Sequence, residues 1–199
     1  MSAKCSDTTH LVTVMRVLRR APSALHFRRN EHSKRVARLA EAVAAAMELP
    51  EAEVSSIRRA ALLHDVGNVG LSVDVLLKPG PLTEEEFRHI QEHVHRGTRD
   101  VAAVETLRDT APIVQSHHEW VNGAGYPEGL RGEAIPVGSR VVAAADAYVM
   151  MTARVPWRAA RSHEEAIDEL HSNAGTQLDE EIVARLVAIL RGRGHGTGD

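Results

Sequence analysis

Apolar residues recur at helical spacing along most of the chain, and short breaks rich in proline or glycine separate the periodic segments. In one such segment Val36 and Leu39 lie on the apolar face, Asn30 is a suitable N-cap, and Pro50 marks the end. A short amphipathic helix is predicted before it, at residues 11–20. We find neither a strand pattern nor an internal repeat, so the pattern predicts an all-helical domain.

Capping residues mark the starts of several further helices. Thr83 with Glu86, and Ser162 with Glu165, have the spacing of a capping box, in which side chain and backbone groups satisfy each other. Asp179 can cap a final helix. Beyond the helix that ends at Pro50, the predicted helices are 51–64, 83 to about 107, 111–118, about 138–153, one that starts at 162, and 179 to about 190.

The segments between these helices suggest how the chain is organised. Residues 119–136 form a long loop rich in glycine, and long loops inside compact helical domains are more often functional than structural. Residues 67–80 are predicted as loop with at most one short helix. We expect an N-terminal helical extension at 1–25, one domain at 26–190 and a disordered glycine-rich tail at 191–199.

Composition narrows the class of protein. Of the 199 residues 43% are hydrophobic but only 3% are aromatic, so the core must consist mostly of Ala, Val, Leu and Ile. A net charge of -3 offers no basic surface for a nucleic-acid polymer. No apolar run approaches the ~20 residues of a membrane span. There is no secretory signal pattern, and the single Cys5 cannot form an internal disulfide, so we expect a cytoplasmic protein without a membrane partner.

Asp146 is the first residue that suggests chemistry. It lies within an otherwise apolar helical stretch, residues 141–151. A buried carboxylate is costly unless it is paired or binds a metal. From the residues alone two interpretations stay open: Asp146 is a metal ligand, or it pairs with an arginine or caps a kink.

The chain also contains twelve histidines, some of them in suggestive settings. His64 and Asp65 close an apolar run and offer the nitrogen and oxygen donors that divalent metals accept. His117 and His118 are adjacent and can reach one metal if their helix unwinds, as the glycines that follow would allow. Tyr126 brings a ring and a hydroxyl into that loop.

Two other histidines are less informative by themselves. His32 alone is more typical of a surface or core histidine than of a ligand. His93 shares a helix face with His89, four residues earlier, so spacing does not choose between them.

Taken together, these motifs resemble the HD-GYP domain family. The matching residues occur in the family's order: His64-Asp65-Val-Gly67, His93-x-x-x-Gly97, His117-His118-Glu119-x-x-x-Gly123-x-Gly125-Tyr126-Pro127 and Asp146. Residues 78–83 and 175–179 also look like that family, and the resemblance extends from about residue 30 to 190. It implies an all-α fold, a single helical bundle of about seven to eight helices.

The resemblance also implies a centre for two divalent metal ions. One would be held by His32, His64, Asp65 and Asp146, and the other by Asp65, His93, His117 and His118, with Asp65 between them. Iron and manganese are the family's usual metals, and zinc accepts the same donors. Some members bind a third metal through a glutamate at the position of Arg28, so we expect two.

By the same resemblance the chain is a phosphodiesterase that hydrolyses cyclic di-GMP to linear pGpG and/or GMP through a hydroxide that bridges the metals. Asp65 and Asn68 would be catalytic. The substrate would contact Gly125, Tyr126, Arg154 and Arg158.

The chain departs from the family at three positions near the phosphate. Asn68 stands where the family usually has lysine, Val149 where it has aspartate, and Val155 where it has arginine. The metal ligands are complete while the phosphate contacts are fewer, so metal binding is better supported than fast turnover.

Two alternatives stay open. One is a metal-dependent phosphohydrolase that acts on another nucleotide or phosphate ester. The other is a weakly active or non-catalytic signalling module that binds a diguanylate cyclase (GGDEF) domain through the Gly-Tyr-Pro loop. A homodimer is compatible with each of these functions.

Overall fold

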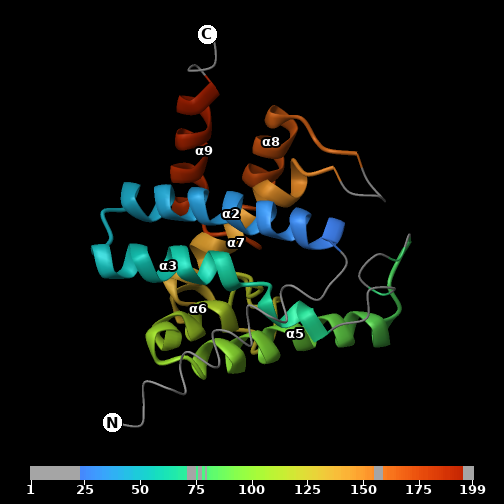
Figure 1. The fold of residues 1–199 in the computed structure, drawn as a ribbon. Coiled ribbons are helices and arrows are strands. Elements are labelled where there is room, and N and C mark those ends of the chain that lie inside the picture. The colour runs from blue at the N-terminus through green and yellow to red at the C-terminus, as the bar shows by residue number, and fades with distance from the viewer. Residues whose placement is uncertain (1–22, 71–74, 76–77, 79, 155–158, 195–199) are drawn as a thin grey trace.

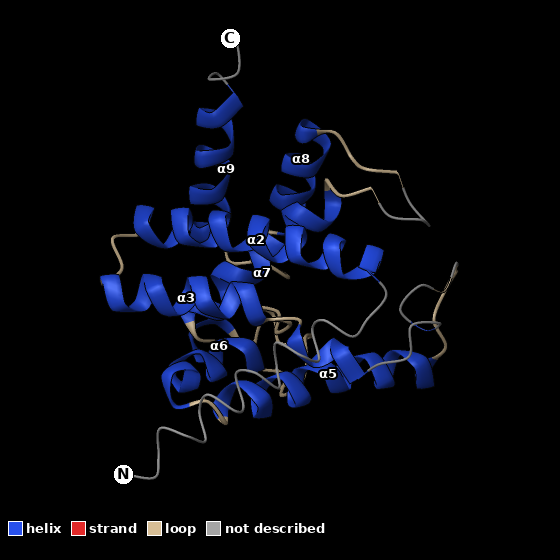
Figure 2. Cartoon of the chain, viewed as in Figure 1, coloured by secondary structure: helices blue, strands red, loops and turns tan. Residues whose placement is uncertain are grey.

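The computed structural model describes residues 23–70, 75, 78, 80–154 and 159–194. No strand occurs among them, which confirms the predicted all-α class (Figure 2). The α-helices in this part of the chain are α2 (Ser23–Ala46), α3 (Glu51–Leu63), α5 (Glu84–Ala102), α6 (Ala111–Gln115), α7 (Val137–Met151), α8 (His163–Asn173) and α9 (Glu180–Gly194). Short 3-10 helices are η1 (Val66–Gly70), η2 (Glu105–Thr110) and η3 (Gly132–Ala134).

Helix α7 lies at the centre of the bundle. It contacts α2, α3, α6, α8 and α9, so almost every face of it is covered. Helices α8 and α9 lie on one side of the α2 and α3 pair, and α5 and α6 lie on the other (Figure 1). A helix surrounded in this way must be apolar nearly all round, and Val141, Ala144, Ala145 and Val149 are fully buried. The one acidic residue of α7, Asp146, is therefore largely enclosed, with 19% of its side chain exposed.

Predicted helix starts agree with the structure where a capping group was recognised. Both capping boxes are formed, by Thr83 with Glu86 and by Ser162 with Glu165. Asp179 accepts hydrogen bonds from the backbone N–H groups of residues 181 and 182 at 3.0 and 3.1 Å. These local side-chain signals are reliable because each satisfies donors that the helix itself leaves unpaired.

Other predicted boundaries were wrong. Asn30 does not cap α2, because the helix already begins at Ser23 and Asn30 lies inside it. The helix ends at Ala46, and Pro50 is instead the N-cap residue of α3. The residue types that favour caps are also tolerated within helices, where packing against α3 and α7 decides the helix length.

Three helix ends also differ from prediction. Helix α5 ends at Ala102, and η2 follows it where a continuous helix to about residue 107 was expected. Helix α6 ends at Gln115. Helix α9 continues to Gly194, so residues 191–194 are helical and the predicted disorder of the tail was wrong there.

Several predictions fall outside the described residues. They concern the helix at 11–20, the side chain of Arg28, Val155, Arg158, the last residues 195–199 and most of the segment 71–79. The boundaries of the extension and of the domain stay predictions. Among the helices that the structure describes, none has the length and apolar character needed to cross a membrane.

Candidate metal centre

The seven predicted ligands come from five segments of the bundle and converge. His32 lies on α2, His64 is the C-cap residue of α3 with Asp65 directly after it, and His93 lies on α5. His117 and His118 follow the end of α6, and Asp146 lies on α7. The α6 helix ends before the histidine pair, at Ser116 (φ -114°, ψ 13°), so both rings can turn toward the same space, as predicted.

The donor atoms form two groups. The ligand atoms of His32, His64 and Asp65 lie within 4.8 Å of one another, and so do those of His93, His117 and His118. Asp65 stands between the groups, because its Oδ2 is 3.6 Å from Nε2 of His64 and its Oδ1 is 3.7 Å from Nε2 of His93. Oδ1 of Asp146 is 2.9 Å from Nε2 of His32 and 3.8 Å from Nε2 of His64.

Backbone carbonyls orient three of the rings. Nδ1 of His64, His93 and His117 lies 2.7–2.8 Å from the carbonyl oxygen of the residue three positions earlier. A carbonyl can only accept, so each Nδ1 carries the proton and each Nε2 keeps its lone pair toward the cluster. Metal-binding histidines are typically held in this way.

Three buried polar atoms of the cluster fit a metal. Nε2 of His93 and Nε2 of His117 make no hydrogen bond within the described part of the chain, and Oδ1 of Asp146 has Nε2 of His32 as its near neighbour at 2.9 Å. Such atoms are costly unless something satisfies them. Because all three are lone-pair donors, a cation satisfies them and a further hydrogen-bond acceptor would not, so the residues present fit divalent metal ions.

Electrostatics keep His117, His118 and Asp146 in the form that binds metal. Burial lowers the pKa of His117 to about 4 and lowers the pKa of His118 well below its usual value, with neighbouring histidines adding to both effects. Burial also acts on Asp146, but the nearby imidazoles of His32 and His64 outweigh it and lower the pKa of this carboxyl. In His32 the effect of Asp146 outweighs burial and raises the pKa. At neutral pH, His117 and His118 are therefore uncharged and Asp146 is ionised.

The structure also decides between the two histidines on α5. His93 is buried against the cluster, whereas His89 is 38% exposed and lies 3.6 Å from Glu92. Gly67 and Gly97 allow η1 to approach α5 closely. A Cβ on Gly67 would lie 1.9 Å from the carbonyl oxygen of His93 and 2.6 Å from the backbone N of Gly97. The close approach of η1 to α5 brings Asp65 beside His93.

The loop after the histidine pair is held by a buried carboxylate. Glu119 accepts hydrogen bonds from the backbone N–H groups of Glu128, Gly129 and Leu130 at 2.7, 3.1 and 3.1 Å. Glu119 belongs to the motif that resembles the family, but the sequence did not predict that its carboxylate anchors the loop. Its signal was an acidic residue directly before a glycine-rich loop.

Tyr126 and Gly125 lie where that loop returns to the cluster. The Tyr126 ring stacks on His118, with centroids 4.8 Å apart, and its N–H donates to the carbonyl oxygen of His118 at 3.2 Å. A Cβ on Gly125 would lie 2.3 Å from the backbone N of Trp120, so this position needs glycine for packing. Whether Gly125 also contacts substrate stays a prediction.

The remaining predicted residues have mixed outcomes. The side-chain amide of Asn68 donates to Oδ1 of Asp65 at 2.6 Å, so Asn68 holds the carboxylate between the two groups. Val149 is part of the apolar core. Arg154 is exposed beyond the end of α7, and its role in substrate binding stays a prediction, as does that of Arg158.

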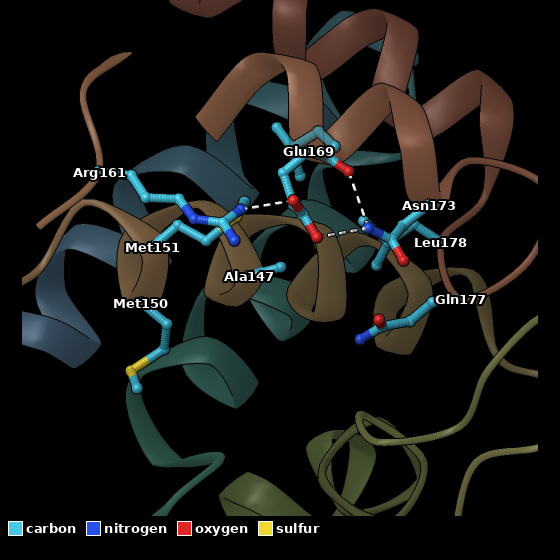
Figure 3. A pocket seen from close by; sticks show the side chains of 9 residues that line it. Ala147, Met150, Met151, Arg161, Glu169, Asn173, Gln177 and Leu178 are labelled. Atoms are coloured by element: carbon cyan, nitrogen blue, oxygen red, sulfur yellow. Dashed lines mark hydrogen bonds and ion pairs between the residues drawn. The ribbon is translucent and has the colours of Figure 1, made fainter. Parts of the chain in front are cut away.

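A hollow lies between α7 and α8, and none of the seven expected metal ligands lines it (Figure 3). Its charged groups neutralise each other, since Nη1 of Arg161 is 2.6 Å from Oε2 of Glu169 and the Asn173 amide donates to the same carboxylate at 3.2 Å.

Comparison with known proteins identifies the family of the chain. A family model described as "HD domain" matches residues 16–182. The chain belongs to the HD domain family. Similar curated proteins include the 3'3'-cGAMP-specific phosphodiesterase 3 of Vibrio cholerae, 35% identical over 78% of this chain and 34% of that protein. The cyclic di-GMP phosphodiesterase of Thermotoga maritima is 34% identical over 87% of this chain and 48% of its own length.

Each of these HD domain relatives is longer than the chain, which spans between a third and a half of their length. Among solved structures, the HDG"Y"P protein from Bdellovibrio bacteriovorus has a TM-score of 0.66 at 22% identity, over 82% of this chain and 53% of that one. The HD domain of the L. monocytogenes phosphodiesterase PgpH has a TM-score of 0.54 at 17% identity, over 84% of this chain and 93% of that one. These two likenesses show the shared fold.

Proposed function

We propose that the chain is a metal-dependent phosphodiesterase that hydrolyses a cyclic dinucleotide, with cyclic di-GMP as the first candidate. The observation that carries this proposal is the pair of donor groups joined by Asp65, whose two oxygens face a histidine of each group. Similar proteins are named as phosphodiesterases of cyclic di-GMP or 3'3'-cGAMP, which supports the substrate class.

The residues would hold two cations. His32, His64, Asp65 and Asp146 form one site, and Asp65, His93, His117 and His118 form the other. When bound, such a pair lowers the pKa of water to give hydroxide and stabilises charge that develops on a phosphoryl group. Iron or manganese is the proposed metal, and the same nitrogen and oxygen donors accept zinc.

Asn68 and Tyr126 would support the reaction without binding metal. Asn68 keeps the Asp65 carboxylate between the two groups through its 2.6 Å hydrogen bond. Burial, with the negative charges of Asp65 and Asp146, raises the pKa of Tyr126. Its hydroxyl therefore stays protonated at neutral pH and can donate a hydrogen bond to a phosphate oxygen.

Arg35 supplies positive charge beside the cluster. It lies one turn after His32 on α2, is half-buried, and donates to Oγ1 of Thr152 at 3.0 Å. Its charge is near enough to His32 to act against protonation of that ring. Arg35 can therefore supply some of the attraction for phosphate that Asn68, being neutral, lacks.

The test is hydrolysis by protein purified and loaded with iron or manganese without oxygen. We expect cyclic di-GMP to be converted to pGpG or GMP, and chromatography of the products decides which. The variant His93→Ala should lose this activity, while His89→Ala, on the same helix but outside the cluster, should keep it.

Two outcomes would contradict the proposal. If the protein hydrolysed only another phosphate ester, the chain would be a phosphohydrolase with a different substrate. Failure to hydrolyse any ester with two cations bound would favour a non-catalytic module. The GGDEF partner, a homodimer and the cytoplasmic location stay predictions.

A further inference from the structure

An unbroken row of aromatic rings leads from the cluster to the surface. His118 stacks on Tyr126, with an interplanar angle of 24°, and Tyr126 meets Phe87 edge to face, with centroids 6.1 Å apart and planes at 78°. We call Phe87, Tyr126 and His118 the aromatic row. Phe87 lies on α5, the helix that also carries His93, so a rigid element fixes its distance from the metal ligands.

Phe87 is unusual in a chain with so few aromatics. It is 46% exposed, although the bundle buries most of its other large apolar side chains. Single exposed apolar residues are ordinary and need no explanation. Phe87 differs from Leu62 and Met150, which are also exposed, because its ring touches an aromatic residue that stacks on a candidate metal ligand.

We propose that Phe87 is a specificity-determining residue that stacks on a purine base of the substrate. This inference rests on the proposed function, since it assumes a nucleotide phosphate at the metal centre. Tyr126 meets Phe87 at an interplanar angle of 78° and does not stack on it, and Phe87 is 46% exposed, so its ring can receive another ring from the solvent side. Nucleobases stack on such faces with little regard to sequence.

The dimensions of the row suit one nucleotide. Successive centroids are 4.8 and 6.1 Å apart, so the Phe87 ring lies within about 11 Å of the His118 ring, a span that one nucleotide with its phosphate at the cluster can cover. With the phosphate at the cluster and Tyr126 beside it, the base would reach Phe87. Phe87 would then determine affinity for substrates that carry a base, while the metal ligands carry the chemistry.

The test compares Phe87→Ala and Phe87→Trp with the metal-loaded parent protein. Removing one stacked aromatic costs about 1–3 kcal/mol, so the alanine variant should bind cyclic di-GMP roughly 5- to 150-fold more weakly. Its KM should rise similarly while kcat stays within about twofold. Phe87→Trp should restore binding. Leu62→Ala, which removes an equally exposed apolar side chain from α3, should behave as the parent does.

A second substrate separates stacking from general damage. A linear diester that joins two riboses without bases should be hydrolysed equally by the parent and by Phe87→Ala. Equal affinity of both proteins for cyclic di-GMP, or equal loss with the base-free diester, would overturn the inference. Direct binding, measured by calorimetry, separates the two proposals: a parent that binds but never hydrolyses cyclic di-GMP contradicts the proposed function, and weaker binding by the alanine variant still supports stacking.

Discussion

Asp65 is the residue on which the centre depends, because its two oxygens face His64 and His93 from opposite donor groups. We predict that Asp65→Asn, which keeps the size but not the charge, lowers the metal content from two cations to one or none per chain and abolishes hydrolysis. Elemental analysis of the purified protein measures this. His89→Ala is the matched control and should retain both cations, and a variant at Asp65 with full metal content would contradict the bridging role.

Asn68 acts on the same carboxylate from outside the ligand set. Removal of an outer hydrogen-bond partner typically reduces metal affinity or activity by about 10–100-fold. We therefore expect Asn68→Ala to weaken metal binding by roughly tenfold while the fold is unchanged. Competition with a chromogenic chelator measures the affinity, and the same affinity in variant and parent would show that Asp65 needs no such support.

At the residue scale the sequence predicted which side chains converge but not how they are held. The family resemblance supplied all seven expected ligands, and the structure places these side chains close together. Spacing alone could not choose His93 over His89, because that choice depends on where η1 packs against α5. The contact between Phe87 and Tyr126 was not predicted either, because it joins residues far apart in the chain.

Among the elements, the contact between η1 and α5 is the most sensitive to substitution. A methyl group on Gly67 would strike the backbone of His93 and Gly97, which cannot move without shifting α5. We expect Gly67→Ala to destabilise the protein by about 3 kcal/mol and to separate Asp65 from His93. Urea unfolding measures the first effect and metal content the second.

Gly192 on α9 is the matched control. A Cβ there would meet nothing within 4 Å, so Gly192→Ala should be neutral or stabilise the helix by about 0.5–1 kcal/mol. Equal stabilities for the two variants would show that the contact between η1 and α5 is looser than the structure indicates.

The loop after His118 depends on the Glu119 carboxylate. Glu119→Ala would leave three backbone N–H groups without their acceptor, and we expect a loss of about 3 kcal/mol in the free energy of unfolding. Denaturant titration measures the loss. Glu133→Ala, an exposed glutamate in η3 of the same loop, should change stability little, and an effect as large as that of Glu119→Ala would mean that the loop tolerates no change of charge.

Sequence reasoning was more accurate for helix starts than for helix ends. Thr83, Ser162 and Asp179 accept hydrogen bonds from backbone N–H groups that are close in the sequence. A helix start marked by such a residue can therefore be predicted from the local sequence. No local residue type marked the ends of α2, α5 and α9. The glycine-rich loop was predicted as functional, but its anchoring by Glu119 spans residues nine to eleven positions apart.

For the whole molecule, helical periodicity predicted the all-α class, and the family resemblance predicted the bundle. The apolar sequence predicted α7 as a helix but not its central position or its neighbours, because periodicity indicates a buried face without identifying the helix that covers it. The candidate metal centre lies where these neighbours meet, so its geometry could be known only from the folded chain.

This placement predicts that cations stabilise the entire bundle, since their ligands come from α2, α3, α5, α7 and the end of α6. A ligand that binds only the folded state at about 100 times its Kd adds about 2.7 kcal/mol. For a chain of this size, that corresponds to a rise in Tm of about 5–10 °C. Calorimetry should therefore show a lower Tm after chelation and recovery when manganese or iron is returned. Asp65→Asn should show a much smaller shift, and an equal shift in this variant would place the stabilising cation away from the cluster.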